Sequence, residues 1–237
     1  MNSQFLVIIP ARGGSKGLIN KNILKFSGKP LIYWTIKAAL KCRFFKEVVV
    51  STDSIKIKKI SEKYGALVPF LRPKNISKDI SPSHLLIKHC INYFQKKKIF
   101  FKYIVLLEPT SPIRLPNDLE ISVSKFLKNL KKIDSLISLG EVFEHPFVIK
   151  KINKSKAVDF VKNKKNYTQR QSLPKFYFPS GVIYISKISS YLKYKKFYTK
   201  NTGYYFIKKY QNLEIDDIYN FHAAEAIFKK LKLDKKL

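Results

Sequence analysis

Short apolar runs alternate with segments of helical periodicity along the first 140 residues. The run at 5–9 has no polar position, a pattern typical of a strand buried on both faces of a sheet. Similar runs follow at 47–51, 66–70, 103–107 and 135–139. Between them, the apolar spacing predicts helices at 30–42, 55–64, 83–95 and 117–130. This alternation predicts an α/β fold with a mostly parallel sheet and helices on both faces.

The segment at about 140–178 interrupts this alternation. It is rich in Lys and Asn and holds only short β-like pieces, such as 147–152. Strand patterns return at 182–185 and 204–207, and a helical pattern occupies 217–231. We therefore expect a single domain over 1–237, with 140–178 as an inserted arm that forms a dimer contact.

The composition is that of a chain with a substantial core. Hydrophobic residues make up 45% of the 237 positions, but no apolar run approaches the roughly 18–20 residues that span a bilayer. The two cysteines, Cys42 and Cys90, indicate neither a disulfide framework nor a zinc site. We expect a cytoplasmic protein with no membrane partner.

The net charge of +31 raises the alternative of a nucleic-acid-binding protein, because Lys and Arg neutralise phosphates. However, the basic residues are spread along the whole chain, and only five of the 47 are arginines. Such a bias towards lysine is typical of an AT-rich genome, so we expect no nucleic-acid partner. In such a chain, the planar fork of each arginine marks a position where bidentate contact matters.

A glycine-rich loop follows the first predicted strand and runs to Asn22. Gly13, Gly14 and Gly17 allow the backbone N–H groups to form an anion-binding nest, and Arg12, Lys16 and Lys21 add positive charge. The order Gly-Lys-Ser/Thr of a Walker A loop is absent, as is the GxGxxG spacing of a dinucleotide fold. The loop therefore predicts a phosphate site of another kind.

The run Pro-Ala-Arg-Gly-Gly-Ser-Lys-Gly at 10–17, followed by Lys21-Asn22, resembles the signature of the CMP-sialic acid synthetase family. These acylneuraminate cytidylyltransferases include the bacterial enzymes for legionaminic and pseudaminic acid. Further similar motifs occur in the family's order at 28–31, 50–54, 70–73, 107–114, 169–174, 181–185 and 213–217. The resemblance implies a Rossmann-like, three-layer nucleotidyltransferase fold. It also implies transfer of CMP from CTP to the anomeric hydroxyl of a nonulosonic acid, with release of pyrophosphate by a homodimer.

The resemblance further assigns roles to individual residues. It implies catalytic roles for Arg12, Lys21 and Asp216, and a Mg²⁺ site at Glu214 and Asp216. The nucleotide-binding set would be Ala11, Arg12, Gly13, Ser15, Lys16, Lys21, Asn22, Arg72 and Ser83. The sugar-binding set would be Glu108, Arg170, Tyr184, Tyr204 and Tyr205.

Several positions leave alternatives open. Ser83 either reads the base or caps a helix, and at least one of the three tyrosines is expected in the core. Arg114 either positions the loop at 108–114 or forms a surface salt bridge. Asp53 is predicted to support the end of a strand, outside the catalytic set.

The chain also departs from the family pattern. Glu108 replaces the usual Gln, Glu214 replaces an Asp, and Phe178 and Ser180 replace residues of an Arg-Pro-Asn-Gly motif. Glu108 favours a sugar other than N-acetylneuraminate. Phe178 and Ser180 leave the sugar specificity open, and the extra methylene of Glu214 is expected to loosen the geometry of the metal site. Another sugar acid, such as the eight-carbon Kdo, is the alternative substrate.

Overall fold

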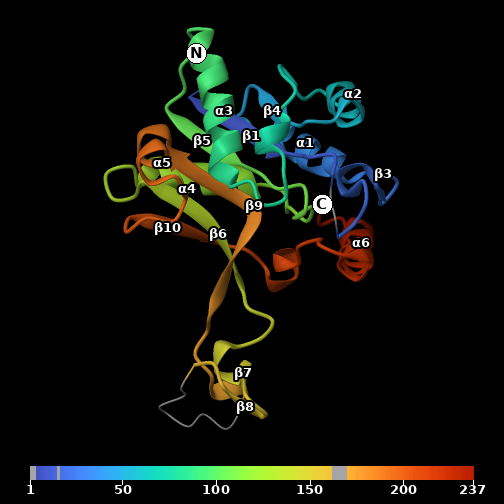
Figure 1. Cartoon of the computed structure of the whole chain (residues 1–237), viewed down its shortest axis with the longest axis vertical. Helices are drawn as coiled ribbons and strands as arrows, with labels where there is room; N and C mark the ends of the chain where they lie inside the picture. The colour runs from blue at the N-terminus through green and yellow to red at the C-terminus, as the bar shows by residue number, and fades with distance from the viewer. Residues whose placement is uncertain (1–3, 15–16, 162–169) are drawn as a thin grey trace.

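The structure of the chain is a computed structural model that describes residues 4–14, 17–161 and 170–237. Its centre is a six-stranded sheet with the strand order β10-β6-β9-β5-β1-β4 (Figure 1). Strands β4 and β5 lie parallel to β1, and β10 lies parallel to β6, whereas β9 is antiparallel to both of its neighbours. The predicted α/β fold with a mostly parallel sheet is confirmed. The sheet strands are β1 (Phe5–Pro10), β4 (Val48–Ser51), β5 (Tyr103–Leu106), β6 (Ser135–Glu141), β9 (Tyr177–Lys187) and β10 (Thr202–Phe206).

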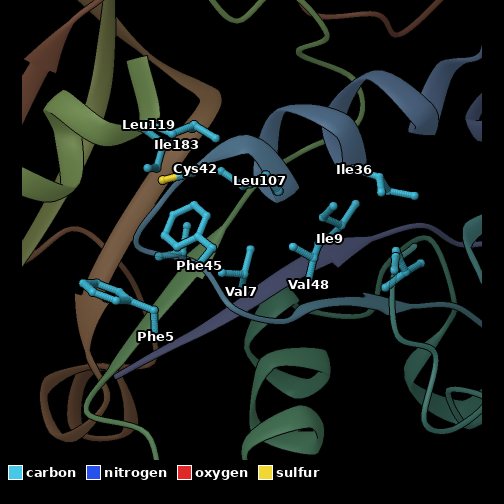
Figure 2. Close-up of a cluster of buried hydrophobic side chains, with 14 of the residues drawn as sticks. Phe5, Val7, Ile9, Ile36, Cys42, Phe45, Val48, Leu107, Leu119 and Ile183 are labelled. Carbon is cyan, nitrogen blue, oxygen red and sulfur yellow. The ribbon is translucent and has the colours of Figure 1, made fainter. Parts of the chain in front are cut away.

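Helices cover both faces of this sheet. Side chains along β1 alternate between two cores, because successive residues of a strand point to opposite faces. Phe5, Val7 and Ile9 join the core beneath α1, α2 and α4 (Figure 2), whereas Leu6 and Ile8 join the core beneath α3 and α5. The sheet and the helices on each of its two faces form three layers. The helices are α1 (Leu31–Lys41), α2 (Ile55–Lys63), α3 (Ser83–Lys96), α4 (Asp118–Lys128), α5 (Ile188–Tyr194) and α6 (Ile218–Leu233).

A third, smaller core attaches α6 to the sheet domain. Phe221 and Phe228 of α6 pack against Phe26 with ring centroids 5.5 and 5.2 Å apart. Ile113 and Ile215 belong to the same cluster. This packing brings the segment before α6 beside the loop that follows β5. Phe26 lies in a small antiparallel ribbon made of β2 (Lys25–Phe26) and β3 (Lys29–Pro30).

The segment between β6 and β9 extends away from the sheet (Figure 1). Its tip is an antiparallel hairpin of β7 (Lys150–Asn153) and β8 (Lys156–Asp159). His145 anchors its base, because its Nε2 lies 2.9 Å from the carbonyl oxygen of Pro174 and its ring packs 4.8 Å from that of Phe176. We call this segment the arm.

Several predicted elements differ from the observed ones. Strand β9 begins at Tyr177, not at 182, because its first residues pair with the end of β6 at Glu141. The predicted strand at 66–70 is not formed: Leu67, and Leu71 just after this stretch, make only isolated bridges, to Val49 of β4 and to Thr52 after it. Helix α5 was not predicted. No helix in the described ranges is both long and apolar enough to cross a membrane.

Candidate active site

The glycine-rich loop leaves the sheet at the point where the strand order reverses. From β1 the chain first builds β4 on one side and later β5 on the other. Ligands of open α/β sheets bind beyond the carboxyl ends of the strands at such a switch point. The loop's first turn is tied to the neighbouring strand, because the N–H of Ala11 donates to the carbonyl of Ser51 over 2.9 Å.

Two side chains fix the shape of the loop. Asp53 Oδ1 accepts the N–H of Gly13 at 2.8 Å, and the buried Asn22 donates its side-chain amide to the carbonyl of Arg12 at 3.1 Å. Asn22 thus holds the loop from its carboxyl-terminal end. Ser15 and Lys16 lie outside the described residues.

The loop contacts the acidic segment that precedes α6. Lys21 Nζ donates to the carbonyl of Ile215 at 2.7 Å and lies 3.2 Å from Asp216 Oδ1. A Cβ atom added to Gly17 would lie 2.6 Å from the carbonyl oxygen of Asp216, so only glycine fits this approach. The N–H of Ile215 in turn donates to Thr110 after β5 at 2.9 Å. Three segments far apart in the sequence therefore meet at one place.

A cleft of about 240 Å³ lies at this junction. Six of the predicted site residues line it: Arg12, Lys21, Asn22, Arg72, Ser83 and Glu108. The remaining wall comes mainly from the segment 76–83 and from Pro109 and Thr110. The structure thus gathers residues predicted to bind base, phosphate and sugar around a single cavity.

Arg72 is a buried cation with unused donors. Its side chain is only 5% exposed, and its Nε and Nη2 have no hydrogen-bond partner among the described residues. Burial lowers its pKa, while the charge of Asp53 acts in the opposite direction. Unsatisfied buried donors are costly, so a cationic fork at the wall of a cleft indicates a ligand with hydrogen-bond acceptors.

Arg12 already has an acidic neighbour. Its Nη1 forms an ion pair with Asp79 Oδ1, and both side chains are about one-third exposed at the cleft, at 31% and 27%. A phosphate group would compete with Asp79 for this guanidinium. Asp79 was not predicted, since neither its spacing nor its surrounding motif distinguishes it from a surface residue.

Arg114 holds the loop that follows β5. Its buried guanidinium donates five hydrogen bonds: to the carbonyls of Glu108, Ser111, Gly181 and Val182, and to the hydroxyl of Thr35. Burial lowers the pKa of Arg114 to about 10, so it stays charged at neutral pH. Of the two predicted roles, positioning of the loop is correct and a surface salt bridge is wrong.

Glu108 lies in the loop that Arg114 holds and faces the cleft. Burial, reinforced by the charge of Glu214, raises its pKa to about 7. Added to Gly181, a Cβ atom would approach Glu108 Oε2 to 2.6 Å, so the glycine leaves room for the carboxylate. The Glu108 side chain therefore packs against the backbone of β9 at Gly181.

The two carboxylates predicted to bind Mg²⁺ have different surroundings. Glu214 Oε1 accepts the N–H of Gly181 at 2.9 Å and the hydroxyl of Ser111 at 3.4 Å, whereas the Asp216 side chain is 77% exposed beside Lys21. The described residues contain no group of three or more His, Cys, Asp or Glu side chains that could hold a metal ion. Mg²⁺ commonly uses one or two carboxylates together with substrate phosphates. The pair fits an ion of that kind.

Comparison with known proteins decides the family. Residues 6–236 match the family model described as cytidylyltransferase. The chain belongs to the cytidylyltransferase family. It is 34% identical to the N-acylneuraminate cytidylyltransferase of Escherichia coli O18:K1:H7 over 99% of its own length, but it spans only 54% of that relative. It is 32% identical to the pseudaminic acid cytidylyltransferase of Campylobacter jejuni, over 94% of this chain and 96% of the relative.

A solved structure of CMP-2-keto-3-deoxy-manno-octonic acid synthetase in complex with CTP has the same fold. The TM-score is 0.70, with 96% of this chain and 99% of that chain covered. The identity of 16% means that this likeness concerns the fold alone.

Other predicted site residues lie apart from the cleft lining. Tyr184 is buried in the core beneath α3 and α5, with its ring 5.4 Å from that of Phe197. Burial raises the pKa of Tyr184, and the charge of Glu108 adds to this. The hydroxyl of Tyr205 donates to Asp118 at 2.9 Å. These contacts satisfy the expectation that at least one of the tyrosines is a core residue.

Two predicted sugar-binding residues and Ser83 complete the set. The exposed ring of Tyr204 lies 4.4 Å from Lys125 Nζ, outside the cleft lining. Arg170 begins a short 3-10 turn, Arg170–Ser172, and its side chain lies outside the described residues. Ser83 does not cap α3, because Pro82 occupies the N-cap position and no side chain caps this end. Ser83 lines the cleft, so of its two predicted roles only contact with the base stays open as a prediction.

Proposed function

We propose that the chain transfers CMP from CTP to the anomeric hydroxyl of a nonulosonic acid and releases pyrophosphate. The observation that carries this proposal is the contact of the glycine-rich loop, through Lys21, with Asp216 beside a cleft whose wall includes Arg72, a buried cation with unpaired donors among the described residues. These features supply the two ends of a nucleotide site in one cavity.

The base would bind at Arg72 and Ser83. Cytosine presents acceptors at O2 and N3, which suit the parallel N–H groups of a guanidinium, and an exocyclic amine, which suits a hydroxyl acceptor. Uracil carries a hydrogen on N3 and would oppose the same donors. Arg72 therefore favours CTP over UTP.

The phosphates would bind at the loop. Backbone N–H groups next to Gly13 and the charges of Arg12 and Lys21 can surround the α- and β-phosphates. During the reaction, the sugar hydroxyl loses its proton to solvent and forms a bond to the α-phosphorus, while the bond from that phosphorus to the leaving pyrophosphate breaks. Negative charge grows on the leaving pyrophosphate. The hydrogen bond from Lys21 to the carbonyl of Ile215 holds the lysine where it can stabilise that charge.

We assign Mg²⁺ to Glu214 and Asp216. Bound there with the triphosphate, the ion would neutralise phosphate charge. Lys21 Nζ already lies beside Asp216, so the lysine and the ion would act on the same phosphates from adjacent positions.

The sugar would lie towards Glu108. A carboxylate at this position suits a substituent that donates hydrogen bonds better than one that only accepts them. We therefore propose a nonulosonic acid other than N-acetylneuraminate as the preferred substrate. Arg170 is proposed to pair with the sugar's carboxylate.

We further propose that the arm joins two copies of the chain and that the enzyme acts in the cytoplasm. In support of the first, Ile152 and Phe160 of the arm are 76% and 62% exposed. Exposed apolar groups concentrated on a projecting hairpin favour an association surface. Both cysteines are free and buried, which is consistent with a reducing compartment.

A substrate panel tests the function. The purified chain is offered sialic, legionaminic, pseudaminic and Kdo acids, each with CTP, UTP, ATP or GTP and Mg²⁺, and pyrophosphate release is measured. We expect release with CTP and at least one nonulosonic acid, and release about 100- to 1000-fold slower by Arg12→Ala. Absence of release with every nonulosonic acid, or release only with Kdo, contradicts the proposal. Binding to DNA and RNA, measured on filters at several salt concentrations, tests the alternative based on charge.

A further inference from the structure

Strand β9 is irregular where it passes the candidate active site. Its pairing with β6 shifts register, because Ile137 pairs with Tyr184 whereas the next residue, Ser138, pairs with Ser180. Residues 181–183 therefore lie outside the ladder with β6, and we call them the β9 bulge. Bulges are common beside active sites, where they redirect groups that a regular strand would aim elsewhere.

The first two residues of the β9 bulge bond to the candidate site. The N–H of Gly181 donates to Glu214 Oε1 at 2.9 Å. The carbonyl of Gly181 accepts the N–H of Glu108 at 3.0 Å. Arg114 donates to the carbonyls of Gly181 and Val182, both at 2.9 Å. The β9 bulge thus joins the loop after β5 to the acidic segment before α6.

A single hydroxyl closes the other side of the β9 bulge. Ser138 Oγ lies 2.7 Å from the carbonyl oxygen of Ser180 and 3.0 Å from that of Ile183, and it accepts the N–H of Ile183 at 3.0 Å. Ser138 is 0% exposed, so water does not compete for these bonds. Buried backbone groups need partners, and here the hydroxyl takes the place of the ladder bonds that a regular strand would make.

The place of Gly181 sets the geometry of two carboxylates. A Cβ atom added to Gly181 would lie 2.6 Å from Glu108 Oε2 and 2.7 Å from Ser111 Oγ, so the backbone approaches both side chains as only a glycine can. Glu214 Oε1 accepts from the N–H of Gly181 and from Ser111 Oγ, at 2.9 and 3.4 Å. These bonds to one oxygen fix the direction in which the second oxygen of Glu214 points.

We propose that Ser138 is a positioning residue for the Mg²⁺ site, because its hydroxyl holds the β9 bulge in the shape that orients Glu214. The inference rests on the proposed function, since it concerns the ion assigned to Glu214 and Asp216. Ser138 touches neither the ion nor CTP in this scheme. It acts through Ile183 and Gly181 on the orientation of one carboxylate.

A purely structural role for Ser138 makes a different prediction, and Ser135 provides the comparison. Ser135 belongs to the same strand and is also 0% exposed. Its Oγ donates to the carbonyl of Phe197 at 2.6 Å and lies 3.0 Å from Thr202 Oγ1, and these partners lie outside the cleft lining. Loss of either serine hydroxyl should lower stability, but only loss of the Ser138 hydroxyl should alter the response to Mg²⁺.

The test measures how strongly Mg²⁺ promotes CTP binding. Dissociation constants for CTP are determined by calorimetry in Mg²⁺ and in EDTA, and the ratio of the two is the Mg²⁺ coupling. Both values come from one preparation, so the ratio does not depend on how much of it is folded. The affinity of Mg²⁺ for free CTP is common to all variants.

The variants separate the hydroxyl from the carboxylate. They are Ser138→Ala, the matched control Ser135→Ala, Glu214→Gln and the double variant of Ser138→Ala with Glu214→Gln. Gly181→Ala displaces the β9 bulge by a second route and leaves Ser138 in place.

We expect Ser138→Ala to lower the Mg²⁺ coupling about 3-fold or more, while Ser135→Ala keeps the wild-type value. Gly181→Ala should lower the coupling as well. The double variant should lose no more coupling than Glu214→Gln, because both substitutions act on the same carboxylate.

Unchanged coupling in Ser138→Ala, or an equal loss in Ser135→Ala, would overturn the inference. A double variant that loses more coupling than Glu214→Gln would separate Ser138 from Glu214 and also overturn it. Wild-type coupling in Gly181→Ala would do the same even if Ser138→Ala does not fold. These results leave the proposed function intact, whereas a wild-type chain that does not bind CTP, or binds it equally in Mg²⁺ and EDTA, contradicts the proposed site itself.

Discussion

Replacement of Arg114 by lysine should destabilise the protein although the charge is kept. The guanidinium makes five hydrogen bonds at 2.6 to 2.9 Å, four of them to backbone carbonyls of the loop after β5 and of β9. An ammonium group has three donors and no planar fork, so at least two of the five hydrogen bonds to the buried charge would be lost.

The magnitude follows from those hydrogen bonds. Each lost hydrogen bond to a charged group costs about 1.5–3 kcal/mol, so two of them cost about 3–6 kcal/mol. For a chain of this size, 1 kcal/mol shifts the melting temperature by about 2–4 °C. Urea unfolding of Arg114→Lys should therefore show a lower midpoint with an unchanged slope, and the melting temperature should fall by several degrees.

Arg43→Lys is the matched control. Arg43 pairs with Glu120 at 3.3 Å, but its side chain is 71% exposed. Exposed ion pairs contribute little, so this variant should stay within about 0.5 kcal/mol of wild type. An Arg114→Lys protein that is as stable as Arg43→Lys would refute the interpretation that the guanidinium holds the loop.

The remaining predictions concern the cleft. Gly17→Ala should lower kcat/KM for CTP with little change in secondary structure by circular dichroism, since the added methyl would meet the Asp216 carbonyl at 2.6 Å; unchanged kinetics would show that the loop does not need this approach. Arg12→Ala and Asp216→Ala should each lower kcat about 100- to 1000-fold while leaving the melting temperature near that of wild type; full activity in either would contradict its role. Burial raises the pKa of Glu108 to about 7 in the folded chain, from 4.5 for an ordinary Glu, so the folded chain binds this proton more tightly than the unfolded chain. The stability that this proton provides is fully present below pH 4.5 and is lost as the pH rises to 7. In metal-free buffer, wild type should lose up to about 3 kcal/mol over that window relative to Glu108→Gln, and parallel pH profiles in urea unfolding would be evidence against this.

The sequence predicted the location of the site better than its internal contacts. Buried strands of a parallel sheet have a strong apolar signal, and polar loops at their carboxyl ends meet by topology. Hence Arg72 and Glu108, which come from distant segments, line one cleft with Arg12 and Lys21 of the glycine-rich loop. The ion pair of Arg12 with Asp79 could not be predicted, since it depends on how the segment before α3 folds back over the loop.

Local signals failed where tertiary contacts decide the structure. Helix α5 is short and contains two serines, and burial of Ile188 and Tyr191 compensates for its weak propensity. Ser83 has the residue type of an N-cap, but Pro82 takes that position. Strand β9 begins early because β6 is available as a partner, which the residues at 177–181 do not reveal by themselves.

The central claim is that the glycine-rich loop and the acidic segment before α6 together bind CTP with Mg²⁺. Calorimetric titration of the purified chain with CTP, in Mg²⁺ and again in EDTA, tests it most directly. We predict one CTP site per chain that weakens at least 10-fold in EDTA and is nearly lost in Lys21→Ala. Failure to bind CTP, or equal affinity with and without Mg²⁺ and in Lys21→Ala, would contradict the account.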